Sequence, residues 1–191
     1  MKYEIKNNLL TVATQLDSPH CNDRPPNTLI ELVVIHGISL PPGKFGTGVI
    51  EDFFCGKLPF TTEPYYEPIK DLKVAAHLLI SRQGKITQFV PFDRRAWHAG
   101  ISTFAGKSGC NDFSIGIELE GTDHVPYEEI QYEQLTAVLQ AIMSTYPVIT
   151  RDRIVGHEDV APGRKTDPGP SFDWSRLDCL SLPSHNTVIY R

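Results

Sequence analysis

Long apolar runs separated by proline- and glycine-rich stretches dominate the first half of the chain. Residues 32–35 form a continuous apolar run, which is typical of a central strand buried on both faces. Two further apolar runs, at residues 74–80 and 85–90, flank a short polar segment that ends in Gly84. Glycine readily adopts the positive φ that a tight turn requires, so this pattern predicts a β-hairpin.

The segment 113–121 alternates in polarity instead. Its isoleucine and leucine side chains would project to one face, while Gly116, Glu118 and Glu120 would project to the other. A carboxylate inside an otherwise apolar strand costs free energy unless it has a partner. We therefore expect Glu118 to face a metal-bound water, a lysine or backbone donors.

Helical spacing of apolar residues begins after Glu128. The repeating apolar positions predict an amphipathic helix that packs on the core and ends at Pro147. Shorter helices are predicted at residues 49–55 and after Asp173, which can cap the second of them. The members of the apolar stripe are Leu135, Val138, Leu139, Ile142 and Met143.

The proline-rich loops between residues 37 and 69 are long for a compact domain. Such loops tend to be functional, so we expect them to wall a substrate groove. The N-terminal stretch 18–26 is expected to be an extended loop, with His20 at the surface. The tail 181–191 is expected to be loosely held.

These elements predict the fold class α/β (α+β): a single domain, residues 1–191, with a mixed central β-sheet flanked by helices. The 191 residues, 40% hydrophobic and 21% charged, suffice for one full core. The net charge of −5 argues against a nucleic-acid binder, which usually carries a basic excess. It also argues against a protein that clings to anionic membrane surfaces.

The sequence also indicates where the protein acts. No apolar run approaches the roughly 20 residues of a membrane helix, and the first residues lack the apolar core of a signal peptide. The four cysteines include no CxxC pair, and we expect all of them to be reduced thiols. A cytoplasmic protein without a membrane partner is therefore expected.

The chemistry concentrates in the segment 154–170. It starts as an apolar strand and continues as a loop shaped by proline and glycine. His157 and Asp167 are side chains that Zn²⁺ accepts, and the third ligand should be another histidine at a strand end. His36, which follows the apolar run 32–35, fits that place. Taken singly, each of the three residues is more simply explained as a hydrogen-bonded loop residue.

Trp97 and His98 precede a glycine in a second unusual segment. Two interpretations remain open from the residues alone. The pair can be ordinary core packing, since tryptophan is mostly buried. It can equally be an aromatic platform for the face of a sugar, with His98 making a polar contact.

Four long strings carry a resemblance that covers roughly residues 17–180. They are His36 with residues 38–43, residues 91–100, residues 110–123 and residues 156–174. The sequence resembles the zinc amidases that cleave N-acetylmuramoyl-L-alanine, a family related to phage T7 lysozyme and the peptidoglycan-recognition proteins. It is most similar to the cytoplasmic branch that acts on anhydro-muropeptides in cell-wall recycling.

The resemblance implies the fold of that family and one zinc ion held by His36, His157 and Asp167. It also implies that Glu118 is the catalytic carboxylate and that Lys165 stabilises the oxyanion. Three protein ligands leave a fourth tetrahedral position, as is usual for catalytic rather than structural zinc. The implied reaction is hydrolysis of the lactyl amide bond between the muramic acid and L-alanine.

The implied substrate-binding residues are Trp97, His98, Asn111 and Arg164. The implied partner is an anhydro-muropeptide, bound by a monomer. The sequence departs from the cytoplasmic branch at Gly37, where those enzymes carry asparagine. The segment 106–109 is also less basic than its counterpart, so weaker recognition of an acidic stem peptide is expected.

Two other functions are compatible with this fold. A recognition module would bind muropeptide without cutting it, but such modules lack the complete set of metal ligands, glutamate and lysine that is present here. A secreted amidase would act on the intact cell wall, but the missing signal peptide and the acidic balance argue against it.

Overall fold

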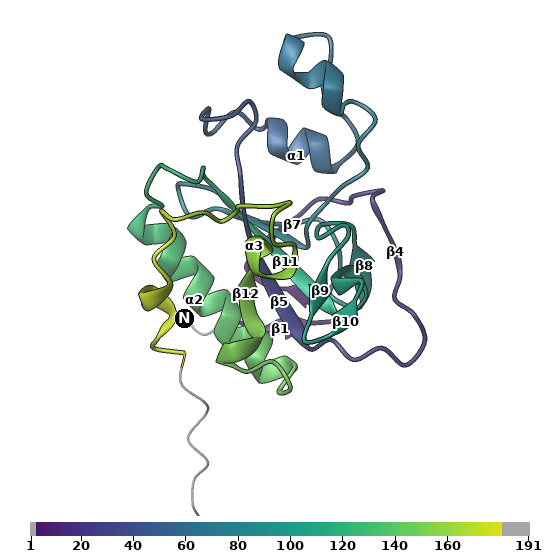
Figure 1. Cartoon of the computed structure of the whole chain (residues 1–191), viewed down its shortest axis with the longest axis vertical. Helices are drawn as coiled ribbons and strands as arrows, with labels where there is room; N and C mark the ends of the chain where they lie inside the picture. Colours follow the sequence, from purple (N-terminus) through teal and green to yellow (C-terminus); the bar gives the residue numbers. More distant parts are fainter. Residues whose placement is uncertain (1–2, 181–191) are drawn as a thin grey trace, which may run out of the picture.

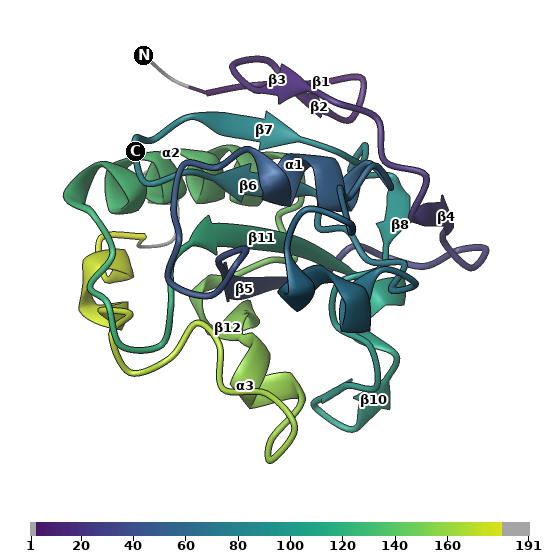
Figure 2. The ribbon, with the colours of Figure 1, turned by 90° about the horizontal axis from the view of Figure 1, so that it is seen from above.

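The structure is a computed structural model that describes residues 3–180. Its centre is a six-stranded mixed sheet in which the first four strands are parallel to one another (Figure 2). In spatial order the strands are β12 (Ile154–Gly156), β5 (Leu32–Ile38), β11 (Ser114–Glu120), β6 (Leu78–Ile80), β7 (Ile86–Gln88) and β3 (Thr14–Gln15). Strand β7 pairs antiparallel with β6 and parallel with β3.

Helices cover both faces of this sheet. Helix α2 (Glu129–Thr145) lies behind the strands in Figure 2, and helix α1 (Val49–Phe54) lies in front of them. Leu135 and Leu139 of α2 share a buried cluster with Ile117 of β11, whereas Phe54 of α1 packs in a second cluster. Fully burying a side chain of this size contributes roughly 1.5–3 kcal/mol, so the apolar stripe of α2 is sufficient reason for its position.

Smaller elements lie around the sheet (Figure 1). They are β1 (Ile5–Lys6) paired with β2 (Leu9–Leu10), β4 (Cys21–Asp23) paired with β8 (Arg94–Ala96), β9 (Thr103–Phe104) paired with β10 (Lys107–Ser108), helix α3 (His157–Val160), and the 3₁₀ helices Pro64–Ile69, Cys110–Asp112, Arg151–Arg153 and Trp174–Leu177.

Most of the predicted elements are confirmed, including the fold class. The hairpin forms from β6 and β7, with strands shorter than the apolar runs, and α1 and α2 occupy their predicted segments. Asp173 caps the 3₁₀ helix Trp174–Leu177 by accepting from the backbone N–H of Ser175. The prediction for the tail 181–191 lies outside the described residues.

The N-terminal prediction is wrong in one respect. Residues 21–23 are not loop but the strand β4, and its pairing with β8 draws the preceding His20 inward. His20 is only 8% exposed, and its Nδ1 lies 3.0 Å from the Val74 carbonyl oxygen.

Two further features concern the cysteines and the helices. All four cysteines are free in the structure. Among the described helices, none combines the length and the apolar character that crossing a membrane requires.

Candidate metal centre and active-site cavity

Three parallel strands end side by side at the candidate site. Glu118 on β11 is opposite His36 on β5 in the strand register. On the other side of β5, Gly156 is opposite Ile35, so His157 follows at the level of His36. The carboxyl ends of parallel strands are where open α/β sheets place their ligands, and here they bring together residues 36, 118 and 157.

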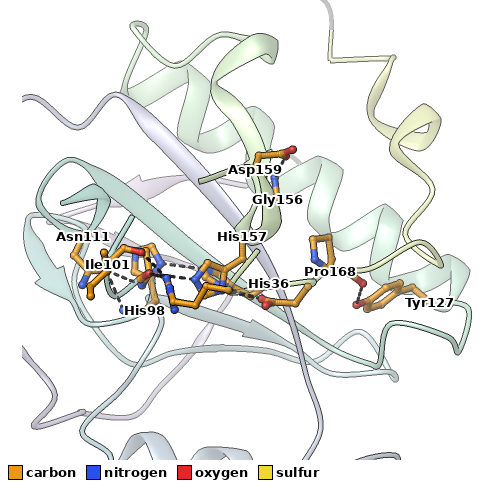
Figure 3. Close-up of polar contacts among 12 residues, drawn as sticks. His36, His98, Ile101, Asn111, Tyr127, Gly156, His157, Asp159 and Pro168 are labelled. Atoms are coloured by element: carbon orange, nitrogen blue, oxygen red, sulfur yellow. Dashed lines mark hydrogen bonds and ion pairs between the residues drawn. The ribbon is translucent and has the colours of Figure 1, made fainter. Parts of the chain in front are cut away.

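Three donor atoms converge at this edge (Figure 3). The Nδ1 atoms of His36 and His157 are 2.9 Å apart, and Asp167 Oδ2 lies 3.2 Å from the first and 3.0 Å from the second. A tetrahedral zinc ion with bonds of about 2.0 Å spaces its ligands about 3.3 Å apart. The donor set and its spacing therefore fit zinc.

The charges of these residues also suit a cation. Burial lowers the pKa of His36 to about 4, so its imidazole is neutral at neutral pH. Burial acts to raise the pKa of Asp167, but the neighbouring imidazoles of His157 and His36 outweigh it and hold that pKa below its usual value. A neutral imidazole and an ionised carboxylate are the forms that bind a metal.

Glu118 lies next to this set and is only 8% exposed. Its Oε2 has no hydrogen-bond partner among the described residues. Burial, and then the charge of Asp167, raise its pKa well above the usual value, while Lys165 acts in the opposite direction. An unpartnered buried carboxylate is costly, and such groups with shifted pKa values cluster at functional sites.

The site opens into a cavity of about 260 Å³. Its polar lining is contributed by His36, His98, Glu118, His157, Lys165 and Asp167. Its apolar lining is contributed by Ile38, Leu40, Phe53, Phe54, Tyr65, Ile69, Leu72, Val74, Ala75 and Trp97. The loops between residues 37 and 69 thus wall a groove, as predicted.

The structure brings most of the predicted site residues to this cavity, but two of them lie elsewhere. Arg164 does not line it, and its Nη2 donates to the carbonyl oxygens of Ala99 at 2.6 Å and Ile101 at 2.7 Å. Asn111 Oδ1 accepts from the backbone N–H groups of His98 at 3.1 Å and Ala99 at 2.7 Å. Both side chains hold the loop 98–101 in place, and their contact with substrate remains a prediction.

Trp97 lines the cavity with its position fixed by a hydrogen bond. Its indole Nε1–H donates to Asn22 Oδ1 at 2.7 Å, and its ring stacks near His20 with centroids 6.3 Å apart. The partial exposure of the ring leaves an aromatic surface toward the cavity. The interpretation as a platform for a sugar face stays a prediction.

Tyr127 supports the site and was not identified from the sequence. Its hydroxyl donates to the carbonyl oxygen of Pro168 at 2.9 Å, directly after the candidate ligand Asp167 (Figure 3). A Cβ atom on Gly37 would lie 2.3 Å from that hydroxyl, and one on Gly121 would lie 2.3 Å from the ring. The glycine at position 37 therefore makes room for Tyr127. The sequence feature that could have indicated a bulky side chain at this place was the pair of glycines, Gly37 and Gly121, at the ends of two adjacent strands.

Replacing Glu118 by glutamine is expected to raise the thermal stability of the zinc-free protein at pH 8. The folded-state pKa of this carboxyl is raised, so the folded chain binds a proton that the unfolded chain releases above about pH 4.5. The free energy of unfolding therefore falls as the pH rises above that value, and glutamine avoids this loss.

Melting curves at pH 4.5 and pH 8, recorded by circular dichroism with chelator present, measure the effect. Each 1 kcal/mol corresponds to about 2–4 °C for a chain of this size. The gain in melting temperature should be larger at pH 8 than at pH 4.5. A variant that melts below the parent at pH 8 would contradict the expectation.

Known proteins with similar sequences were found for nearly the whole chain. The family model described as N-acetylmuramoyl-L-alanine amidase matches residues 25–170. The 1,6-anhydro-N-acetylmuramyl-L-alanine amidase AmpD of Haemophilus influenzae is 53% identical over 173 residues, which are 91% of this chain and 94% of that protein.

Solved structures show the same relationship. A crystal structure of a selenomethionine AmpD derivative superposes with a TM-score of 0.89 at 50% identity, covering 92% of this chain and 98% of that one. The amidase AmiD of Escherichia coli, solved with the substrate anhydro-N-acetylmuramic acid-L-Ala-D-γ-Glu-L-Lys, gives a TM-score of 0.57 at 29% identity, covering 94% of this chain and 65% of that one. On this evidence, the chain belongs to the N-acetylmuramoyl-L-alanine amidase family.

Proposed function

We propose that this protein is a zinc-dependent amidase that hydrolyses the lactyl amide bond between anhydro-N-acetylmuramic acid and L-alanine of muropeptides in peptidoglycan recycling. The observation that carries the proposal is the convergence of two imidazole nitrogens and a carboxylate oxygen beside the unpartnered carboxylate of Glu118. Family membership and the names of the relatives support the choice of bond and substrate.

His36, His157 and Asp167 would hold the zinc ion. When bound, zinc supplies a Lewis acid that polarises the substrate carbonyl and lowers the pKa of water to about 7. Glu118 is placed to accept the proton of the attacking water, and its raised pKa suits later delivery of that proton to the leaving amine.

Lys165 has a separate role at the same wall of the cavity. Its side chain lines the cavity, and among residues 3–180 no ion pair engages its ammonium group. A free cation beside the reacting carbonyl stabilises the negative charge that develops on the oxygen. One donor of this kind contributes roughly 3–4 kcal/mol in comparable sites.

The apolar lining of the cavity suits the sugar part of the substrate. Trp97 offers a flat face, and side chains of α1 and the following loop also line the cavity. The related AmiD was solved with an anhydro-N-acetylmuramyl peptide, which supports the same class of ligand here. We assign the anhydro-sugar to this apolar lining and the stem peptide to the neighbourhood of Lys165.

We also propose that the enzyme acts in the cytoplasm and as a monomer. The free state of all four cysteines supports a reducing compartment. The recycling branch that the sequence resembles provides the rest of the argument. Size-exclusion chromatography with light scattering would detect a dimer if one forms.

Incubation of the purified protein with anhydro-muropeptide is expected to release free peptide and anhydro-sugar. A chelator should abolish the release, and added Zn²⁺ should restore it, because the proposed ligands hold the only metal the reaction needs. Mass spectrometry of the products, with ordinary muramyl peptide as a parallel substrate, measures both the bond cleaved and the preference for the anhydro ring.

Two outcomes would change the proposal. Zinc-loaded protein that binds the muropeptide without cutting it would point to a recognition module. Cleavage of ordinary muramyl peptides alone would keep the amidase activity and contradict the recycling role.

A further inference from the structure

A second histidine lies directly behind the metal ligand His36. His98 Nδ1 is 2.9 Å from His36 Nε2, and His98 Nε2 is 3.1 Å from Ser114 Oγ. We propose that His98 and Ser114 are positioning residues of the metal centre, which act through His36 and hold its Nδ1 lone pair toward the metal. This inference rests on the proposed zinc site.

The donor and acceptor in each hydrogen bond of the series from Cys110 to His36 follow from the carbonyl group of Cys110, at the end farthest from the metal site. Ser114 Oγ lies 2.6 Å from the carbonyl oxygen of Cys110, which can only accept, so the hydroxyl proton points there. The hydroxyl oxygen must then accept from His98 Nε2–H. A neutral His98 therefore presents its Nδ1 lone pair to His36.

His36 must in turn donate through Nε2–H. Its Nδ1 is then without a proton and faces His157 Nδ1 and Asp167 Oδ2, where the metal would bind. A backbone carbonyl, a serine and a histidine thus select one tautomer of the ligand. Partners of this kind orient metal ligands and raise their basicity in other metal proteins.

The strand β11 is built to hold this relay. Ser114, Gly116 and Glu118 alternate along it and share one face. A Cβ atom on Gly116 would lie 2.4 Å from Cγ of His98, so only glycine leaves space for the ring. One face of a single strand thus provides the anchor of the relay, the space for it and the candidate catalytic carboxylate.

The other histidine ligand, His157, is oriented by a backbone carbonyl group rather than by a side chain. His157 Nε2 lies 3.2 Å from the carbonyl oxygen of Ala99, which again can only accept. The backbone alone selects its tautomer, so no side-chain substitution removes that partner. The two ligands should therefore respond differently to mutation, and His36 is the one that depends on other side chains.

Zinc affinity of four variants tests the relay by competition with a chromophoric chelator. His98→Leu is expected to weaken zinc binding by roughly 10–100-fold, the usual effect of losing such a partner. His98→Asn can place an amide oxygen near the position of Nδ1 and should recover much of the affinity. Ser114→Ala keeps the imidazole but frees its tautomer, and should give a smaller loss.

His20→Leu is the matched control. It removes a buried histidine near the cavity, which contacts Val74 and Trp97 and lies outside the relay. Its zinc affinity should equal that of the parent. Melting temperatures of the zinc-free variants show whether a loss of affinity merely follows a loss of folding, and Ser114→Ala keeps the test valid if His98→Leu does not fold.

Long-range ¹H–¹⁵N correlation spectra of the histidine rings in the zinc-loaded parent provide the second readout. His36 and His98 are both expected to carry their proton on Nε2. A proton on Nδ1 of His98 would overturn the proposal, as would a folded His98→Leu chain with the zinc affinity of the parent. If the folded His98→Leu variant keeps the zinc affinity of the parent but has a raised KM for muropeptide, His98 would instead be a residue that binds substrate.

These measurements need no substrate, so they separate the relay from the proposed function. If the zinc affinities and the protonated ring nitrogens are as expected but the protein cleaves no muropeptide, the inference about His98 and Ser114 stands while the amidase proposal fails. A parent that binds no zinc would overturn both.

Discussion

Glu118→Gln is expected to bind zinc as tightly as the parent and to lose turnover by roughly 10²–10⁴-fold, the range attributed to general acid–base catalysis. The carboxylate is buried beside the three donor atoms without being one of them, so the metal site should remain intact. Glutamine has nearly the same shape but cannot accept the proton of the attacking water. The rate of muropeptide cleavage and the zinc content of the same sample measure the two parts of this result.

Glu120→Gln is the matched control for this prediction. Glu120 is a second buried glutamate on the same face of β11, but it accepts from the backbone N–H groups of Gly46 and Arg82 and does not line the cavity. Its loss should lower the melting temperature and leave turnover much less affected. Turnover of Glu118→Gln within a few-fold of the parent would remove Glu118 from the proposed role.

Asp167→Ala is expected to weaken zinc binding by more than about 100-fold, because removing a ligand should cost more than the 10–100-fold typical of an outer partner. Asp167 supplies the only carboxylate oxygen of the donor set, and with it the negative charge that offsets the charge of the cation. Purified variant should contain little zinc by atomic emission. Its activity should recover only in part when excess zinc is added.

Asp123→Asn is the matched control, which tests whether removing any nearby negative charge weakens zinc binding as Asp167→Ala is expected to do. The Asp123 side chain packs against Gly169 in the same loop, yet it is not one of the three converging donors. Its zinc content should match that of the parent. Full zinc content in Asp167→Ala would show that the third ligand is another residue.

The local elements follow from the sequence because their causes are local. The apolar spacing along 135–143 produces helix α2, and the glycine after the run 74–80 produces the turn between β6 and β7. Alternation along β11 also predicts a buried carboxylate at Glu118. Strands β6 and β7 are shorter than their apolar runs, because an apolar run reports burial and only hydrogen-bonded pairing defines a strand.

The predicted site residues fall into two groups, those that the structure brings to the cavity and those that it does not. His36, Glu118, His157, Lys165 and Asp167 were predicted together, and the structure brings all of them to one cavity. Asn111 and Arg164 were expected to face the substrate, but in the structure their polar groups bind backbone atoms of the loop 98–101. The type of a polar residue indicates which bonds it can make, and the neighbouring backbone decides where it makes them.

The sequence by itself thus determined the fold class, the main helices and strands, and the set of chemical groups available for a metal-dependent hydrolysis. These depend on periodicity and on side-chain chemistry, which are properties of short segments. Only the tertiary structure decided that His98 stands behind His36, that Tyr127 fills the space above Gly37, and that His20 is buried. Each of these contacts joins residues distant in the chain, and their geometry follows from the register of parallel strands rather than from any local pattern.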